Sequence, residues 1–200
     1  GWSAVGPATN VTGSQISTPA NTDFDSAYGT VCFWMLATNV PLPTPGSEAA
    51  ILFDHRTTNG AVIALADTGA IFWQGQQGAQ NSLTAGYVVD GAWHHVAVTY
   101  GQAINDTITI YIDGALAGST VVTNGWSWPP SQAIEIGRSH DSYWKRFDGF
   151  MDDFRIYNRV LTDSEIASIK ASDALVDTAA LKVRYNFGTA AGVGYSVTWP

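Results

Sequence analysis

The chain has 200 residues, of which 46% are hydrophobic and only 13% charged, and its nine Lys and Arg against 17 Asp and Glu give a net charge of −8. This length suits one large β domain with a sizeable core, and the hydrophobic content excludes an intrinsically disordered chain. Because the net charge repels a phosphate backbone, we expect no nucleic-acid partner.

No run of apolar residues approaches the about 20 that span a bilayer, and the N-terminus lacks the basic and then apolar pattern of a signal peptide. We therefore expect a soluble chain with no membrane partner, from which any export signal has been removed. The single cysteine, Cys32, lies in an apolar strand pattern, so we expect a small hydrophobic residue and no internal disulfide.

Patterns typical of β-strands recur along the chain, separated by turns rich in Gly, Asn, Asp and Pro. They cover residues 30–37, 49–56, 61–67, 70–76, 86–90, 94–100, 107–113, 116–122, 133–138, 150–158 and 181–187. Many short strands at this spacing, with no alternation of strands and helices, predict an all-β protein built as an antiparallel β-sandwich or barrel.

One helix is predicted, in "LTDSEIASIKAS" at residues 161–172. Thr162 can cap its first turn, and Glu165 stands three residues later, as in a capping box. Ile166 and Ile169 give the helix an apolar side. It follows directly after the strand at 150–158.

Three stretches in this order carry a resemblance to a known family: "DGAWHHVAVTY" (90–100), "TITIYIDGALAG" (107–118) and "AIEIGRSHDSYWKRFDGFMDDFRIYNRVLTDSEIASI" (133–169). Together they resemble the laminin-G-like domains of the concanavalin A-like lectin and glucanase superfamily, which are often attached to secreted bacterial polysaccharide-degrading enzymes. The resemblance covers roughly residues 15–170. It implies a single jelly-roll β-sandwich over residues 1–200, with one short helix after the strand that carries Asp152.

The N-terminus departs from this family. Such domains usually begin with a strand of the "Leu-x-x-Tyr-x-Phe" kind, which is missing before "GWSAVGPATN", whereas "LKVRYNF" at 181–187 has that pattern. We expect residues 181–187 to return across the sandwich and fill the position, tying the two chain ends together.

Two aspartates stand side by side in the strand pattern "FMDDFRIYN". Strict alternation places Asp152 on the same face as Phe150, Phe154 and Ile156. A lone ionised carboxylate on an apolar face costs several kcal/mol, so it must be paired, hydrogen-bonded or bound to a metal.

Three explanations remain open for this carboxylate. One is a bond to a buried side chain or to backbone amides, with His95 as the candidate side chain. The second is a structural Ca²⁺, which the resemblance implies because many superfamily members hold one. Its candidate ligands are Asp152, Asp153, Asp23 and Asp25. The third explanation is a catalytic carboxylate.

The sequence lacks the features of the superfamily's enzymes. The resemblance implies two Glu flanking an Asp on one strand for a glucanase, whereas the three glutamates of this chain lie in a predicted loop, a strand and a helix. The residue types that a polysaccharide lyase needs are present, but no lyase motif joins them. They are His55, Arg56, Gln74, His140, Tyr143 and Arg146. We expect a domain that is not an enzyme.

Aromatic rings and forked polar side chains, which recognise sugars, gather in the loop-rich stretches. "NGWSWPPSQ" (124–132) places two tryptophans two residues apart, and "GRSHDSYWKRFDG" (137–149) collects rings and charges between two strands. The candidate ligand-binding residues are Trp73, Trp126, Trp128, Arg138, His140, Asp141, Tyr143, Trp144, Arg146, His55 and Arg56. Each also has a structural explanation, as core, as cover of the sandwich edge or as a solvated loop.

These features predict a non-catalytic carbohydrate-binding module that recognises a polysaccharide or oligosaccharide and targets a covalently attached catalytic domain to it. We expect it to be secreted or held at a bacterial cell surface, with structural calcium as its candidate cofactor. The alternative is an adhesion or spacer domain with a protein ligand, and a polysaccharide lyase is the third hypothesis.

Overall fold

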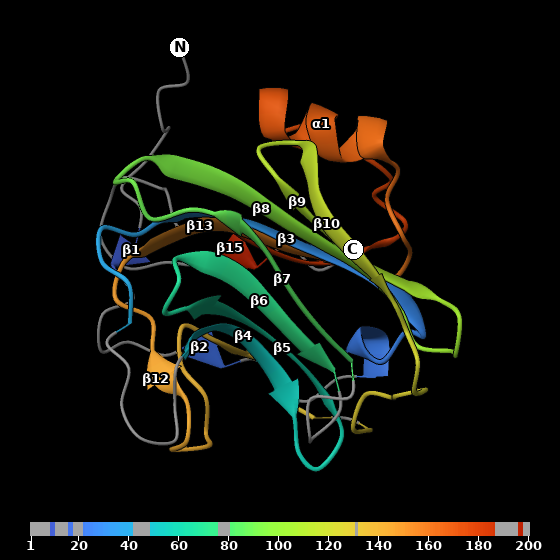
Figure 1. Cartoon of the computed structure of the whole chain (residues 1–200). Coiled ribbons are helices and arrows are strands. Elements are labelled where there is room, and N and C mark those ends of the chain that lie inside the picture. Colours follow the sequence, from blue (N-terminus) through green and yellow to red (C-terminus); the bar gives the residue numbers. More distant parts are fainter. Residues whose placement is uncertain are drawn as a thin grey trace.

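The computed structural model describes residues 9–10, 16–17, 22–41, 49–75, 81–130, 132–186 and 196–197, which form two β-sheets packed face to face (Figure 1). The strands are β1 Thr9–Asn10, β2 Ile16–Ser17, β3 Tyr28–Leu36, β4 Ala49–Arg56, β5 Gly60–Ala66, β6 Ala70–Gly75, β7 Asn81–Tyr87, β8 Trp93–Gly101, β9 Thr107–Ile112, β10 Ala115–Val121, β11 Glu135–Ile136, β12 Lys145–Arg146, β13 Phe150–Tyr157, β14 Leu181–Asn186 and β15 Ser196–Val197. The helical elements of this part of the chain are the 3₁₀ turn Thr22–Phe24 and α1 Asp163–Ser172.

The two sheets confirm the predicted antiparallel sandwich. One has eight strands in the order β10-β9-β8-β3-β13-β14-β15, with β1 also beside β13, and the other has seven in the order β2-β11-β4-β5-β6-β7. Here β12 pairs with β4 in parallel. None of the helices among the described residues is long and apolar enough to cross a membrane.

The core lies between the sheets, where inward-facing side chains of both meet. Phe33 and Phe154 from the eight-stranded sheet stack on each other, with ring centroids 5.9 Å apart, and Phe53 of the other sheet stacks on Phe154 at 5.8 Å. Trp73 belongs to this core, since only 1% of it is exposed. The expectation that Trp73 contacts a ligand is therefore corrected.

Trp126 and Trp128 are also buried, each with 6% exposure, which contradicts their predicted role as exposed binding rings. Their rings pack perpendicular to each other, with centroids 4.7 Å apart. The indole N–H of Trp126 donates to the carbonyl of Gly101, and that of Trp128 donates to the carbonyl of Ser26, both at 3.1 Å. Because these backbone acceptors satisfy the N–H groups, the large apolar rings can be buried at little cost.

Strand β13 contains a β-bulge at the two adjacent aspartates. Asp152 pairs with Trp34 and Arg155 with Cys32, so three steps on β13 match two steps on β3. Asp153 is the inserted residue of the bulge. Its φ is +47°, a conformation that Asp tolerates better than most residues.

The bulge overturns the predicted alternation along β13. Met151, Phe154 and Ile156 face the core, whereas Asp152 and Asp153 lie on the opposite side of the strand. The prediction that Asp152 shares a face with Phe154 and Ile156 is wrong, because one inserted residue reverses the faces that follow.

Asp153 is neutralised by two arginines. It accepts from Arg155 Nε at 2.9 and 3.0 Å and from Arg184 Nε at 2.8 Å. Asp173, at the C-terminal end of α1, also accepts from both guanidinium groups, and Arg155 donates to the carbonyl of Ala174. Burial opposes the charge of Asp153, but the arginines outweigh burial and lower its pKa.

His95 does not form the predicted bond with Asp152, because neither of its ring nitrogens has a hydrogen-bond partner among the described residues. Its ring is 1% exposed and packs edge-on against Trp34 at 5.4 Å. Burial lowers the pKa of His95 to about 4, so its imidazole is neutral.

The C-terminal part completes the eight-stranded sheet. Helix α1 has the predicted capping box, in which Thr162 Oγ1 accepts from the Glu165 N–H and the Glu165 carboxylate accepts from the Thr162 N–H. The helix covers the outer face of this sheet through Ile166 and Ile169 (Figure 1). Strand β14 pairs antiparallel with β13 over residues 181–186. That this segment replaces the missing first strand of the family and ties the chain ends together remains a prediction, and residue 187 lies outside the described residues.

Candidate binding site

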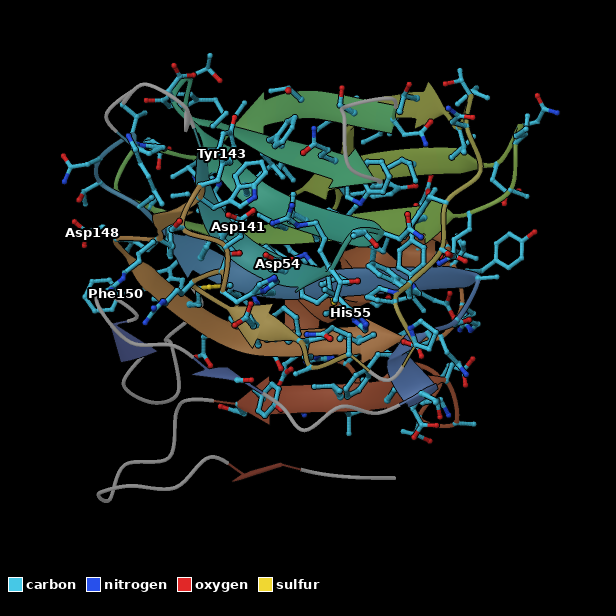
Figure 2. The ribbon with its side chains drawn as sticks, turned by 90° about the horizontal axis from the view of Figure 1, so that it is seen from below. Asp54, His55, Asp141, Tyr143, Asp148 and Phe150 are labelled. Carbon is cyan, nitrogen blue, oxygen red and sulfur yellow. The ribbon has the colours of Figure 1, made fainter. Side chains whose placement is uncertain are left out.

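A loop over residues 137–147 lies on the outer face of the seven-stranded sheet (Figure 2). It begins after β11, where Gly137 adopts a φ of +77° that favours glycine, and it returns as β12 beside β4. The Phe147 N–H donates to the Gly137 carbonyl at 3.0 Å and closes the base of the loop. Phe147 itself is buried in the core and anchors the returning end.

A buried carboxylate, Asp54 of β4, fixes this loop to the sheet. Arg56 donates to both of its oxygens at 3.1 Å, and the Ser139 hydroxyl donates to Oδ2 at 2.5 Å. The same hydroxyl accepts from the Asp141 N–H at 2.9 Å. Asp54 is 1% exposed, and the hydrogen bonds from these three donors offset the cost of burying its charge.

Trp144 anchors the middle of the loop on the apolar part of the same face. Its ring packs against Phe72 at 6.3 Å and joins a small cluster with Ile51 and Val62. The Arg56 guanidinium lies 5.3 Å from the centroid of the Trp144 ring, a cation–π contact. Trp144 is therefore held between the sheet and the polar network.

Tyr143 is the aromatic residue that the loop presents to solvent, with 53% of the residue exposed. Its ring stands perpendicular to Trp144 at 5.1 Å, and its N–H donates to Asp141 Oδ1 at 2.9 Å. Figure 2 shows Tyr143 and Asp141 over the outer side of the seven-stranded sheet, next to Asp54. An exposed ring is thus held in place by neighbours that are themselves fixed.

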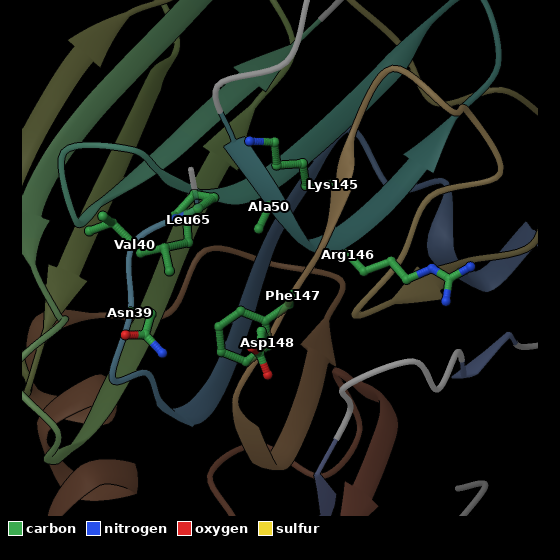
Figure 3. A pocket seen from close by; sticks show the side chains of 9 residues that line it. Asn39, Val40, Ala50, Leu65, Lys145, Arg146, Phe147 and Asp148 are labelled. Carbon is green, nitrogen blue, oxygen red and sulfur yellow. The ribbon is translucent and has the colours of Figure 1, made fainter. Parts of the chain in front are cut away.

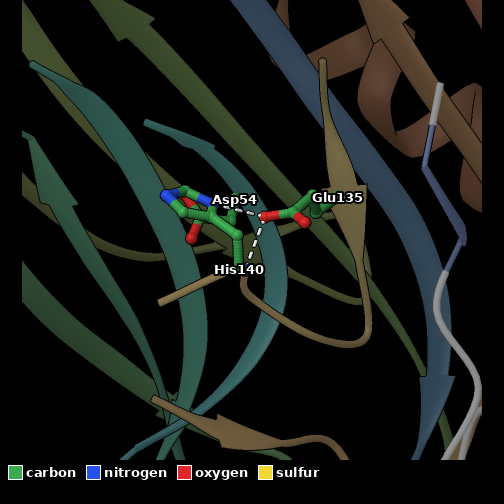
Figure 4. A group of neighbouring side chains, drawn as sticks. All are labelled: Asp54, Glu135 and His140. Carbon is green, nitrogen blue, oxygen red and sulfur yellow. Dashed lines mark hydrogen bonds and ion pairs between the residues drawn. The ribbon is translucent and has the colours of Figure 1, made fainter. Parts of the chain in front are cut away.

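Elsewhere in the loop, Glu135 of β11 holds His140. Glu135 Oε2 accepts from the His140 N–H at 2.7 Å and lies 2.6 Å from His140 Nδ1 (Figure 4). The Glu135 side chain is 9% exposed and that of His140 is 47% exposed. Within the described ranges, Asp54, Glu135 and His140 are the one group of three carboxylate or imidazole side chains gathered closely enough to hold a metal ion, with one atom of each within 4.8 Å of the others.

A hollow of about 500 Å³ adjoins the returning end of the loop (Figure 3). The described residues that line it are Asn39, Val40, Pro41, Ala50, Leu65, Lys145, Arg146, Phe147 and Asp148. Apolar side chains make up part of this lining, together with two cations, an amide and a carboxylate. Of these residues, only Arg146 was expected to bind a ligand.

Comparison with known proteins identifies the family of this fold. The family model described as the concanavalin A-like lectin/glucanases superfamily matches residues 10–167. The chain belongs to this superfamily. It is a lectin-like domain by fold, as the sequence resemblance implied.

Three solved structures share the fold of this lectin-like domain at low sequence identity. A candidate carbohydrate-binding protein from Bacteroides ovatus has a TM-score of 0.70 and 16% identity, over 92% of this chain and 53% of that one. The binding domain of botulinum neurotoxin DC, solved with rat synaptotagmin II, has a TM-score of 0.62 and 15% identity, over 80% and 40%. A heptameric pentraxin from Limulus polyphemus has a TM-score of 0.60 and 14% identity, over 80% and 74%.

One curated protein is similar in sequence. The rat "Sushi, von Willebrand factor type A, EGF and pentraxin domain-containing protein 1" is 23% identical over 150 residues. This match covers 72% of the lectin-like domain but only 4% of the rat protein.

Several predicted binding residues do come together in the loop, but His55 does not. Arg56, His140, Asp141, Tyr143 and Trp144 form the cluster described above, and Arg138 and Arg146 lie towards its two ends. His55 points to the core instead, 4.8 Å from the ring of Trp128, because it alternates with Asp54 and Arg56 on β4. Burial lowers the pKa of His55 to about 4. The lyase residue set is therefore split between two faces.

The four predicted calcium ligands do not gather into one site. The oxygens of Asp153 already accept from two arginines, whose positive charges oppose a cation there. Asp25 precedes β3 and lies 3.4 Å from His55, whereas Asp152 pairs with Trp34, six residues into β3. At a rise of about 3.3 Å per residue this separation is roughly 20 Å, too far for shared coordination.

The sequence interpretation missed Asp54, Ser139 and Glu135. A signal for the first was present, since "FDHR" places Asp54 and Arg56 two residues apart, with opposite charges on one face of an otherwise apolar strand. The sequence gives no such signal for Ser139 and Glu135, because their contacts with Asp54 and His140 form only once the loop over residues 137–147 has folded onto the sheet.

Proposed function

We propose that this lectin-like domain is a non-catalytic carbohydrate-binding module whose contact surface is the loop over residues 137–147. The observation that carries the proposal is the exposed ring of Tyr143, held rigid beside Trp144 and Asp141. A pyranose stacks its C–H face on such a ring, and fixed polar groups next to it accept and donate to the hydroxyls. Rigidity favours affinity, because little side-chain freedom is lost on binding.

The state of the carboxylates supports binding without cleavage. A glycosidase needs one carboxylic acid and one carboxylate on either side of the scissile bond. Here Asp54 is ion-paired with Arg56 and accepts a hydrogen bond from Ser139, and Glu135 is bonded to His140. Both are more than nine-tenths buried under the loop, so neither faces a sugar at Tyr143.

The wider role that we propose is targeting. A module that holds a polysaccharide raises the local concentration of any catalytic domain attached to it. This would place the parent protein outside the cell or at a bacterial surface, where polysaccharides are the substrates. The fold shared with the Bacteroides ovatus protein supports a carbohydrate ligand, and the parent enzyme is an expectation.

Affinity electrophoresis on gels that contain neutral or acidic polysaccharides tests the proposal. Wild type should be retarded by at least one polysaccharide, and Tyr143→Ala should lose that retardation. Tyr28→Ala is the matched control, because Tyr28 is a similarly exposed tyrosine (49%) on the other sheet. The proposal fails if no gel retards wild type, or if both variants migrate alike.

A protein ligand is the second candidate, and strand β10 favours it. This strand is the edge of the eight-stranded sheet, and Leu116 and Val121 on it are 64% and 51% exposed. An open edge with exposed apolar residues can accept a strand from a partner. Leu116→Lys should block such a partner and leave retardation by polysaccharide unchanged, so the two variants separate the candidates.

A further inference from the structure

We propose that Asp54, Glu135 and His140 form a binding site for a divalent transition-metal ion of the Zn²⁺ type, which ties the loop over residues 137–147 to the sheet. These residues come from three separate elements, namely β4, β11 and the loop itself (Figure 4). The site is defined by its own geometry. Only its effect on glycan binding rests on the proposed function.

The spacing of the ligand atoms is close to what one ion needs. A tetrahedral zinc ion with bonds of about 2.1 Å holds its ligand atoms about 3.4 Å apart. Here they lie within 4.8 Å of one another, and Glu135 Oε2 is 2.6 Å from His140 Nδ1. Binding would require the hydrogen bond between Glu135 and His140 to open, so that both atoms can face one ion. Three protein ligands would leave one position for water or a ligand hydroxyl.

The site is rich in carboxylates. Asp54, Glu135 and Asp141 lie at this end of the loop, and Arg56 is ion-paired with Asp54 and Asp141. Asp54 and Glu135 are buried, at 1% and 7% exposure, where water screens their charges poorly. A divalent ion would be attracted to these carboxylates.

The ligand types select the class of metal. An imidazole with two carboxylates suits zinc and its neighbours among the transition metals, whereas calcium takes six to eight oxygen ligands. The half-exposed His140 leaves a path from solvent for the ion. On binding, the ion would replace the hydrogen bond between His140 Nδ1 and Glu135 Oε2.

Arg56 and Ser139 do not compete with the ion for the whole of Asp54. A carboxylate offers about four lone-pair sites, and these two residues use three of them. The remaining one is available to a metal. Hydrogen bonds to a ligating carboxylate commonly orient it towards the ion, and Arg56 and Ser139 are placed to do this for Asp54.

Calorimetric titration of the full chain with Zn²⁺, and separately with Ca²⁺ and Mg²⁺, tests the site. We expect one Zn²⁺ per chain. His140→Ala should weaken Zn²⁺ binding by at least about tenfold, and Glu135→Gln should do the same. Because His140 is half exposed, its alanine variant should fold as wild type does.

The matched control is His94→Ala. His94 also contacts two carboxylates, Asp90 at 3.0 Å and Asp113 at 2.8 Å, but through different ring nitrogens, so the three do not converge on one ion. This variant should bind Zn²⁺ as wild type does. No Zn²⁺ binding, binding unchanged by His140→Ala, tighter binding of Ca²⁺ than of Zn²⁺, or an equal loss in His94→Ala would each overturn the inference.

Two readouts separate this inference from the proposed function. Tyr143→Ala should keep its Zn²⁺ affinity while it loses retardation by polysaccharide. If wild type binds no Zn²⁺ but is still retarded in the presence of EDTA, the metal site is wrong and the carbohydrate site stands.

Discussion

Asp153→Asn should destabilise the domain strongly, because Asp153 is the carboxylate on which two arginines converge. Arg155 is fully buried and donates to it through Nε and a terminal nitrogen, and Arg184 donates at 2.8 Å. Asparagine keeps the shape and tolerates the positive φ of 47° at this bulge, so the substitution removes charge without adding backbone strain. The effect therefore reports on the ion pairs.

The expected loss is about 3 kcal/mol at neutral pH. Breaking a buried ion pair on one side costs about 3–5 kcal/mol, because the partner charge is left unpaired. The lower end applies, since Asp173 still accepts from both arginines. Urea denaturation of wild type and variant, followed by circular dichroism, gives the difference in free energy of unfolding.

The difference should depend on pH in a defined direction. The pKa of Asp153 is lower in the folded protein than the usual value, so its contribution to stability is present above the unfolded pKa of about 4 and is lost as the pH falls through the folded pKa. The gap between wild type and variant should therefore narrow in acid. A gap below about 1 kcal/mol at neutral pH, or one that stays constant into acid, would refute the reasoning.

Three further predictions concern the helix, the returning strand and calcium. Thr162→Ala should cost about 1 kcal/mol in urea unfolding, because it removes the cap of α1, whereas Ser168→Ala within the helix should cost less. Truncation after Ser172 removes β14 with its buried Val183 and Tyr185, so it should lower the melting temperature by more than about 10 °C. An unchanged melting temperature would contradict the prediction that residues 181–187 form a returning strand. Calcium binding remains a prediction, and EDTA lowers the melting temperature if an ion is bound.

The sequence was sufficient for the sandwich and for most of its strands. The continuous apolar run of β3 and the alternating isoleucines of β9 both predict strands, since such short apolar segments between turns must enter the core. The capping box of α1 was equally visible, since its two hydrogen bonds link residues three apart. Most of the fold can therefore be predicted from local apolar patterns and local capping residues.

The bulge in β13 could not be predicted in this way. Alternation assumes one residue per step, whereas the pairing of β13 with β3 skips a step between Asp152 and Arg155. The bulge is favoured because it lets Arg155 be buried against Asp153 and Asp173. Asp173 lies some 20 residues after Asp153 in the chain. An interaction at that separation leaves no mark on local periodicity.

The tryptophans show why the binding residues were only partly predictable. Trp126, Trp128 and Tyr143 all stand in loop-like stretches, and any of them could stack on a sugar. The two indoles are buried because Gly101 and Ser26, remote in sequence, offer carbonyls to their N–H groups.

What distinguishes Tyr143 is the stretch around it. Each neighbour on the loop over residues 137–147 has a partner below it: Ser139 binds Asp54, Asp141 binds Ser139, and Trp144 packs on Phe72. The side chains of these neighbours face inward and are held by their partners, whereas the ring of Tyr143 between them points outward. A sheet face that carries a buried Asp–Arg pair at its centre can thus hold an otherwise irregular loop rigid, and the residue that such a loop leaves exposed is the one best placed to meet a ligand.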